Sequence, residues 1–249
     1  MQRKIIGVLA ILAIAVTVWA GGDPWKSKPY QQWDEKDVMT VLQTSPWAKV
    51  GVPASGSWRP MGMAPADTSN LGVAGSSSDK SHVSAGPNSN QPGGDEKEVN
   101  ATSQTYNIFW WSSRTIREAA ERRAVLKGAT TQADAEKALA AVPDSYQILV
   151  NAVNMAAFGN RGEEAFKSAA FLELKKTKQK ISPTAVIFQK GADGKVVGAI
   201  FSFPKTTSNG EPLISSDEKE IDFNLRIADS WIRTFFSPKQ MADSQGVDL

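Results

Sequence analysis

The sequence predicts an α+β fold, a two-layer sandwich in which helices lie on one face of a mostly antiparallel sheet. Three observations support this prediction. Helical patterns come early in the second half of the chain, at residues 114–127 and 133–142. Strand patterns follow them, and Gly-Ala-Asp-Gly at 191–194 is typical of a hairpin loop. The 249 residues show no internal repeat, and we expect one core.

The first twenty residues have the pattern of a secretory signal peptide. Arg3 and Lys4 supply a positive start, residues 5–20 are apolar apart from Thr17, and Ala20 is the small residue that a leader peptidase reads. We therefore predict cleavage after Ala20 and a mature protein that is periplasmic or secreted. An uncleaved N-terminal anchor is the alternative. No second apolar run is long enough to span a bilayer, so we expect no stable membrane span after cleavage.

Composition divides the mature chain into three parts. Residues 21–52 form an aromatic, proline-punctuated segment and a helix, which we expect to pack on the main domain. Residues 53–104 are rich in Gly, Ser and Pro and lack apolar periodicity, so this low-complexity stretch predicts a long flexible insertion. Residues 105–249 carry the predicted α+β domain.

The expected elements follow from apolar periodicity and from start and stop signals. The N-terminal helix should begin after Asp34, whose carboxylate is a good N-cap, and end at Ser45-Pro46. In chain order, the main domain should contain a strand at 106–111, helices at 114–127 and 133–142, a strand at 145–153, a helix at 163–176 and strands at 183–189, 196–203 and 218–225. Residues 231–236 fit either a last strand or a short helix.

The residue types that are absent exclude several kinds of site. The chain has no cysteine and one histidine, His82, which lies in the low-complexity stretch. Triads with a histidine base, ordinary zinc sites, haem and iron-sulfur ligation, disulfides and a lipoprotein anchor are therefore not expected. We predict no catalytic residue, no metal and no cofactor. The 28 basic and 26 acidic residues are interspersed, so nucleic acid is not an expected partner.

Carboxylates are the only plentiful acid and base groups, so glycan hydrolysis by two of them is the enzyme class that remains. Glu163 and Glu164 are better explained as the acidic first turn of a helix. Glu220 and Asp222 are better explained as the solvent-facing side of a strand. No pair of acids stands out.

The junction between the strand at 106–111 and the next helix is one candidate binding site. Free backbone amides at a helix N-terminus attract anions, and Ser113, Arg114 and Arg117 can add donors there. The alternative is an N-cap serine with two solvated arginines. Arg123 falls near the centre of the apolar face of this helix. It should pair with a buried acid or a ligand, or else extend past the core.

The aromatic side chains of the N-terminal segment are a second candidate. Trp25, Tyr30, Trp33 and Trp47 can form a contact surface for a glycan or a protein around the first helix. The alternative is that these rings hold the helix on the sheet.

Several short motifs support a resemblance. They are Trp33-Asp34-Glu35-Lys36-Asp37-Val38, Ser45-Pro46-Trp47-Ala48, Trp111-Ser112-Ser113 with Arg117-Glu118-Ala119, Phe201-Ser202-Phe203-Pro204 and the segment from Phe236 to Met241. In this order they resemble a group of uncharacterised exported acidobacterial proteins. The resemblance covers both ends of the mature chain. It implies an extracytoplasmic location and an N-terminal helix in the same domain as the distal sheet, and it implies no activity.

These features predict an exported, non-catalytic protein that acts as a binding or interaction module in the periplasm or outside the cell. Its expected partner is an envelope protein or a glycan. Two alternatives remain open: a carboxylate-dependent glycan hydrolase and a structural subunit of an envelope assembly.

Overall fold

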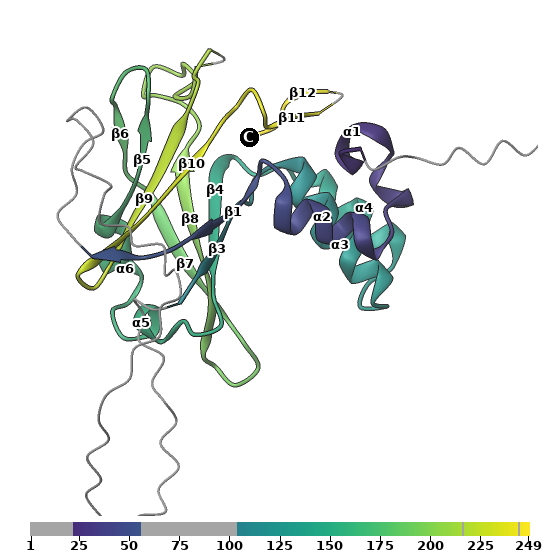
Figure 1. The fold of residues 1–249 in the computed structure, drawn as a ribbon, viewed down its shortest axis with the longest axis horizontal. Coiled ribbons are helices and arrows are strands. Elements are labelled where there is room, and N and C mark those ends of the chain that lie inside the picture. Colours follow the sequence, from purple (N-terminus) through teal and green to yellow (C-terminus); the bar gives the residue numbers. More distant parts are fainter. Residues whose placement is uncertain (1–21, 56–103, 216, 244) are drawn as a thin grey trace, which may run out of the picture.

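The computed structural model describes residues 22–55, 104–215, 217–243 and 245–249 (Figure 1). The predicted signal peptide and nearly all of the predicted insertion lie outside these residues. Within the described part of the chain, no helix has the length and hydropathy of a membrane span.

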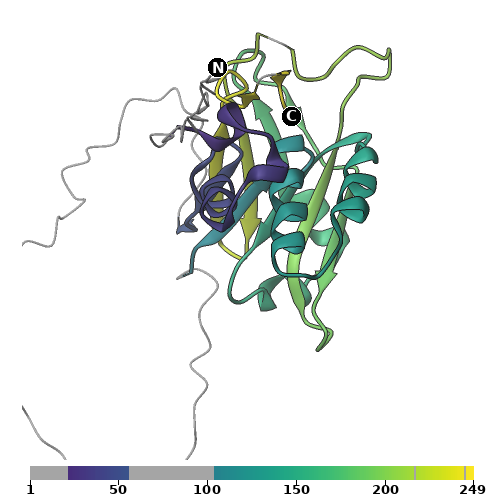
Figure 2. The same ribbon diagram turned by 90° about the vertical axis from the view of Figure 1, so that its right-hand side faces the viewer.

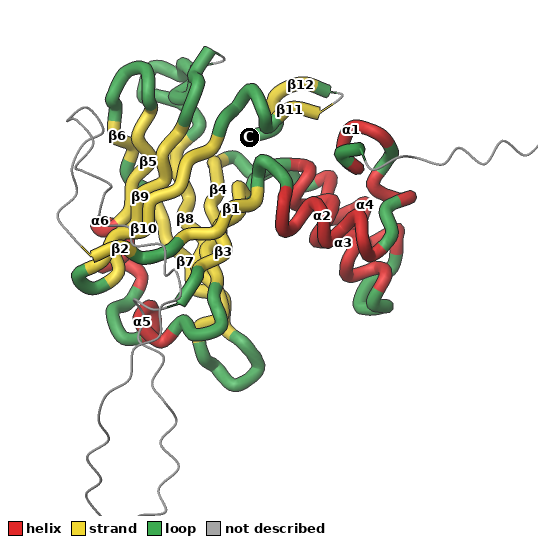
Figure 3. The backbone as a smooth tube through the Cα atoms, viewed as in Figure 1, coloured by secondary structure: helices red, strands yellow, loops and turns green. Residues whose placement is uncertain are grey.

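Two five-stranded antiparallel sheets form the body of the protein (Figure 3). The first has the order β1-β3-β4-β8-β7, from Ala48–Gly51, Tyr106–Trp110, Ser145–Asn151, Val196–Pro204 and Ala185–Lys190. The second has the order β2-β10-β9-β5-β6, from Ala54–Ser55, Ser230–Phe236, Ile221–Ile227, Ala170–Leu174 and Lys180–Ile181. Strands β11 (Ala242–Asp243) and β12 (Gly246–Val247) pair as a small separate ribbon. The α+β class and the antiparallel pairing are confirmed, and the structure adds a second sheet.

The two sheets pack face to face through aromatic side chains. The ring centroids of Phe201 on β8 and Phe223 on β9 are 5.6 Å apart, and those of Trp110 on β3 and Phe236 on β10 are 5.2 Å apart. All four side chains are buried. Edge-to-face ring pairs of this kind each add roughly 0.5–1.5 kcal/mol beyond the burial of apolar area. The core of the protein therefore lies between the sheets.

Gly51 at the end of β1 lies against side chains of both the neighbouring strand β3 and strand β10 of the second sheet. A Cβ atom placed on Gly51 would lie 2.5 Å from Cγ2 of Ile232 and 2.7 Å from Cδ1 of Ile108. Both isoleucines are fully buried. Only glycine fits here without displacing core side chains.

The longer helices gather on one side of the molecule, beside the first sheet (Figures 1 and 2). They are α2 (Glu35–Thr44), α3 (Arg114–Leu126) and α4 (Gln132–Ala140), preceded in the chain by α1 (Pro24–Ser27) and the 3-10 helix η1 (Tyr30–Gln32). Asp34 caps α2 as predicted: its carboxylate accepts from the Asp37 amide at 2.8 Å, and the Asp37 carboxylate accepts from the Asp34 amide at 2.9 Å. This reciprocal box fixes where the helix begins.

The helix predicted over residues 163–176 is wrong in its second half. Helix α6 ends at Ala169 (Glu163–Ala169), and the chain continues as strand β5. Ala170, Leu172 and Leu174 are buried in the alternating pattern of a strand, because β5 pairs with β9 along its whole length. Pairing with a distant strand overrides the local helical pattern.

An aromatic cluster lies near the short helix α5 (Ala156–Gly159). Phe158 and Phe166 are stacked with ring centroids 4.3 Å apart, and both contact Phe188 on β7. This cluster fastens α5 and α6 to the sandwich. The predicted alternatives at residues 231–236 resolve to a strand, β10.

Candidate functional site

A groove of about 470 Å³ brings together four of the predicted binding residues. We call it the aromatic groove; it lies between the α1–η1 segment, the start of α3 and the β11–β12 ribbon. It is lined by Trp25, Lys26, Ser27, Lys28, Pro29, Tyr30, Gln31, Trp33, Arg114, Glu118, Asp243 and Gln245. Trp25, Tyr30, Trp33 and Arg114 were singled out from the sequence. The groove combines ring edges with both basic and acidic groups.

The rings beside the aromatic groove are largely enclosed by protein. Trp25 is 9% exposed, Tyr30 7% and Trp33 1%. The indole nitrogen of Trp33 donates to the backbone oxygens of Pro24 and Lys28 at 3.3 and 3.2 Å, so it fixes the α1–η1 segment. These rings hold the segment against the helices, and only their margins are available to a ligand.

Trp47, the fourth aromatic candidate, does not line this groove. It is fully buried, and its ring packs edge-on against Trp25 with centroids 5.7 Å apart. Its indole nitrogen donates to the backbone oxygen of Asp248 at 2.6 Å. Trp47 thus links the N-terminal segment to the C-terminal end of the described chain.

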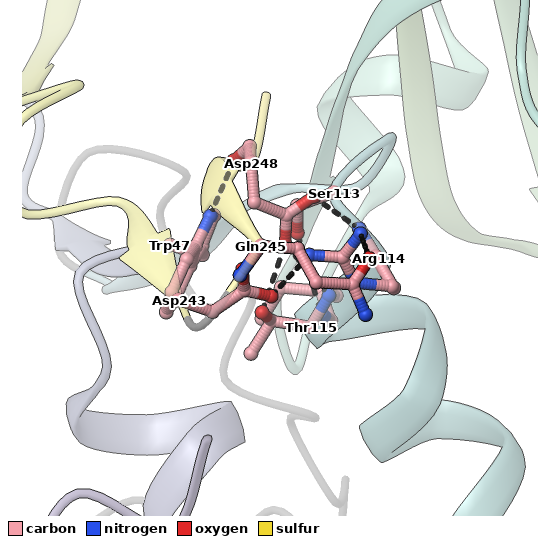
Figure 4. A network of polar contacts seen from close by, with 8 residues as sticks. Trp47, Ser113, Arg114, Thr115, Asp243, Gln245 and Asp248 are labelled. Atoms are coloured by element: carbon pink, nitrogen blue, oxygen red, sulfur yellow. Dashed lines mark hydrogen bonds and ion pairs between the residues drawn. The ribbon is translucent and has the colours of Figure 1, made fainter. Parts of the chain in front are cut away.

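The candidate anion position at the start of α3 is occupied by a carboxylate of the same chain, that of Asp248 (Figure 4). Its Oδ1 accepts from the Arg114 amide at 2.7 Å, and its Oδ2 accepts from the Thr115 amide at 2.9 Å. Ser113 is the N-cap residue and accepts from the Ile116 amide at 3.2 Å. The Asp248 carboxylate therefore neutralises the partial positive charge at the N-terminus of α3.

Arg114 extends from this helix terminus to the C-terminal ribbon. Its Nη1 donates to Gln245 Oε1 at 2.7 Å, and its Nη2 forms an ion pair with Asp243 (Figure 4). Burial opposes the charge of the guanidinium, but the hydrogen bond to Asp243 and the nearby carboxylate of Asp248 raise the pKa of Arg114. Arg114 stays charged and forms one wall of the aromatic groove.

Arg117 and Arg123 do not contact the Asp248 carboxylate at the start of α3. The Nη2 atom of Arg117 donates to three carbonyl oxygens at the end of α4, those of Ala138, Leu139 and Ala141, at 2.7–3.0 Å. It therefore caps the C-terminus of α4. Arg123 is exposed beside a small groove between α2 and α3, away from the helix face that is buried. The neighbouring Arg122 makes the structural contact instead, donating to Trp33 O at 2.8 Å.

Glu118 is the functional candidate that sequence reasoning missed. It lies one helical turn after Arg114 and lines the aromatic groove. Burial raises the pKa of its carboxyl group to about 7; Arg114 and Arg117 act in the opposite direction, and Asp248 and Asp243 add to the rise. The i, i+4 spacing from Arg114 was the only signal in the sequence, and it reads as an ordinary surface ion pair.

The four acidic residues considered above for glycan hydrolysis have structural positions in the fold. Glu163 and Glu164 lie in the first turn of α6 as predicted. Asp222 was expected to face solvent, and that is wrong: it is 2% exposed and forms an ion pair with Arg233. The reason is that β9 is the central strand of its sheet, so side chains from both neighbouring strands flank Asp222. Glu220 pairs with Lys175 at 3.0 Å.

No metal site is formed by the part of the chain that the structure describes. Within it, no group of three or more acidic or histidine side chains is placed to hold an ion. His82 lies outside the described residues.

No protein-family model matches the chain, and no curated protein matches it. Two solved structures show weak similarity, the S-layer protein rSbsC and domains 1–6 of the surface layer protein SbsC. Their TM-scores are 0.20 and 0.23, with 16% and 15% identity over 54% and 50% of this chain. The chain spans 18% and 19% of those proteins.

Proposed function

We propose that this protein is exported and acts outside the cytoplasm as a non-catalytic binding protein for an envelope glycan, which it holds in the aromatic groove. The observation that carries the proposal is the convergence of Trp25, Tyr30 and Trp33 with Arg114 and Glu118 on one groove. These residues come from two distant parts of the chain, and the fold brings them to one surface.

The chemistry of the aromatic groove suits a sugar. Sugar rings present C–H faces to aromatic edges and hydroxyl groups that both donate and accept hydrogen bonds. Gln31 is an exposed amide that can do both, and the amide nitrogen of the exposed Gln245 can donate while its oxygen accepts from Arg114. The carboxyl group of Glu118 can accept a hydrogen bond, and when protonated it can also donate one. A volume of about 470 Å³ is the size of a site for a short oligosaccharide segment.

Capture from the host envelope tests the binding. The tagged protein should retain an envelope polysaccharide that soluble fragments of the same polymer elute. Gln31→Ala should reduce the amount captured several-fold, whereas the matched variant Gln32→Ala should leave it unchanged, because Gln32 is an exposed neighbour outside the groove lining. Equal capture by both variants would place the binding elsewhere, and no captured glycan would overturn the proposal.

Export is tested separately, by the intact mass of the protein purified from its own host. The features of residues 2–20 predict a mature chain that begins at Gly21. A mass that includes Met1 to Ala20 would contradict cleavage of the leader.

A glycan hydrolase is the second candidate, and one observation favours it. Glu118 and Asp243 line the same groove; the pKa of Glu118 is about 7, while Asp243 is ion-paired with Arg114. Glycosidases need one protonated and one ionised carboxyl group. New reducing ends that appear in envelope glycans with the protein, and not with Glu118→Gln, would establish this candidate over the non-catalytic one.

A further inference from the structure

A second, larger groove adjoins the aromatic groove. We call it the lysine groove; its volume is about 940 Å³. It lies between α1, the connection from α2 to β1 and the turn after β10, and it shares Trp25, Lys26 and Asp243 with the aromatic groove. It is large enough for a ligand of the size of a sugar or a short polymer segment.

Two buried hydrogen-bond donors border the lysine groove without an acceptor. The Trp25 indole nitrogen and the Ser45 hydroxyl have no hydrogen-bond partner within the described residues. Trp25 is 9% exposed and Ser45 1%. A buried donor left without an acceptor costs stability, and the indoles of Trp33 and Trp47 nearby both have acceptors. An acceptor supplied by a ligand would remove this cost.

The lysine groove also has an excess of positive charge. Lys26, Lys49 and Lys239 line it together with two acids, Asp23 and Asp243. Both acids are already engaged, Asp23 with Lys26 at 2.8 Å and Asp243 with Arg114. Among the described residues, neither Lys49 nor Lys239 has an ion-pair partner. Two cations are therefore available to a negatively charged ligand.

Lys49 is held at the edge of the core. It lies opposite Ile108 in the β1–β3 pairing, on the side of the sheet that faces the interior, and it is partly buried. Burial lowers the pKa of its amine. An anion bound beside Lys49 would reverse that effect, so the position of this lysine is better suited to a bound ligand than to water.

We infer that the lysine groove is a binding site for an oxyanion, the carboxylate or phosphate group of a sugar-sized ligand, with Lys49 and Lys239 as its cations and Trp25 and Ser45 as its neutral donors. Oxyanions accept several hydrogen bonds and favour this combination of ammonium groups and fixed N–H and O–H donors. The site does not depend on the proposed function. If both are correct, the polymer is an acidic glycan that extends across the two adjoining grooves.

Titration of the purified full chain with small anions tests the inference. The probes are inorganic phosphate and glucuronate, with glucose as the uncharged control, and the readout is the shift of the tryptophan indole N–H resonances. We expect phosphate or glucuronate to shift the Trp25 indole resonance in a saturable way, and glucose to leave it in place. Saturation with glucuronate alone identifies a carboxylate ligand, and saturation with phosphate alone identifies a phosphate ligand; each result supports the site.

Variants separate this site from general surface attraction. Lys49→Gln, Ser45→Ala and the exposed Lys239→Gln should each weaken anion binding, the lysine variants at least tenfold. Lys137→Gln removes the same charge from an exposed position on α4, outside the lining of the groove, and should have no effect. Lys239→Gln guards against a folding defect in the Lys49 variant, because Lys239 is exposed. Absence of saturable anion binding, or equal weakening by Lys137→Gln, overturns the inference. The proposed function would still stand in that case if the protein captured envelope glycan.

Discussion

One oxygen of the Asp248 carboxylate accepts two hydrogen bonds from Thr115, from its backbone amide at 2.9 Å and from its hydroxyl at 2.8 Å. The second carboxylate oxygen accepts from the amide of Arg114. Asp248 therefore caps a helix that begins 134 residues earlier in the chain. The segment that contains Asp248 packs against the start of α3, and its residues Asp243 and Gln245 line the aromatic groove.

Removing this cap should weaken the whole domain. Asp248→Ala leaves the buried amide and hydroxyl of Thr115 and the partly buried amide of Arg114 without their acceptor, and we expect a loss of about 1–2 kcal/mol in the free energy of unfolding. Urea denaturation measures it. Asp229→Ala, at an exposed position in the turn between β9 and β10, is the control and should change stability by less than about 0.5 kcal/mol. An Asp248→Ala protein as stable as the control would contradict the role of this carboxylate.

The contact between Asp248 and Thr115 should also be energetically coupled. Thr115→Val removes the hydroxyl that donates to the carboxylate, so its effect should be smaller in the Asp248→Ala background than alone. A double-mutant cycle in urea measures the difference. Strict additivity of the two changes would show that the hydrogen bond makes no net contribution.

Gly51→Ala should destabilise the sandwich, since the new methyl group overlaps Ile232 and Ile108. We expect a loss of about 1–3 kcal/mol, the usual cost of overpacking a core. Ile108→Val removes the overlapping Cδ1 atom and should recover part of the loss in the double variant. If Gly51→Ala unfolds at the wild-type urea concentration, the sheets are not packed as closely as described.

Arg117 should stabilise α4 locally, because its guanidinium satisfies three carbonyl oxygens at the end of that helix. All three hydrogen bonds come from Nη2, and the ammonium of lysine ends one bond short of that atom, so Arg117→Lys should cost about 1 kcal/mol. Hydrogen exchange should become faster at the amides of α4 before those of the sheets. Arg123→Lys is the matched control on the same helix and should leave exchange in α4 unchanged.

Glu118 should make stability depend on pH. Its pKa is about 7 in the fold, against an ordinary value of 4.5, so the folded state holds a proton that the unfolded chain releases between these values. Stability due to this group is complete below pH 4.5 and is lost as the pH rises through about 7. Glu118→Gln keeps a neutral side chain and should gain about 1–3 kcal/mol relative to wild type between pH 5 and pH 8.

Urea unfolding of the Glu118 variant at the two pH values is compared with that of Glu121→Gln. Glu121 lies on the same helix outside the groove lining, and its variant should follow the wild-type pH dependence. Parallel stability profiles for wild type and Glu118→Gln would contradict the raised pKa.

Local signals in the sequence were sufficient for the features that depend on neighbouring residues. Asp34 and Ser113 were identified as helix caps, and the structure gives each the expected hydrogen bond. The inward face of β9, with Ile221, Phe223 and Leu225, was identified from alternation alone and is buried. These features follow from spacing along the chain, and spacing is visible in a sequence.

Features that depend on distant partners could not be predicted. The end of α6 at Ala169 is decided by the pairing of β5 with β9, and the burial of Asp222 by the central place of β9 in its sheet. An anion at the start of α3 was one of two interpretations of that helix terminus, but nothing in the sequence links it to Asp248. Glu118 was missed because burial is the main cause of its raised pKa, and the burial of one helix position depends on segments that are distant in the chain.

The measurement that tests the proposed function most directly is a titration of the isotope-labelled protein with soluble oligosaccharides released from its own host's envelope. Binding in the aromatic groove predicts saturable shifts of the backbone amides of Lys28, Gln31 and Gln245, with the strands of both sheets unchanged. Shifts confined to other surfaces, or no saturable shift at any oligosaccharide concentration, would contradict the proposal that this groove binds an envelope glycan.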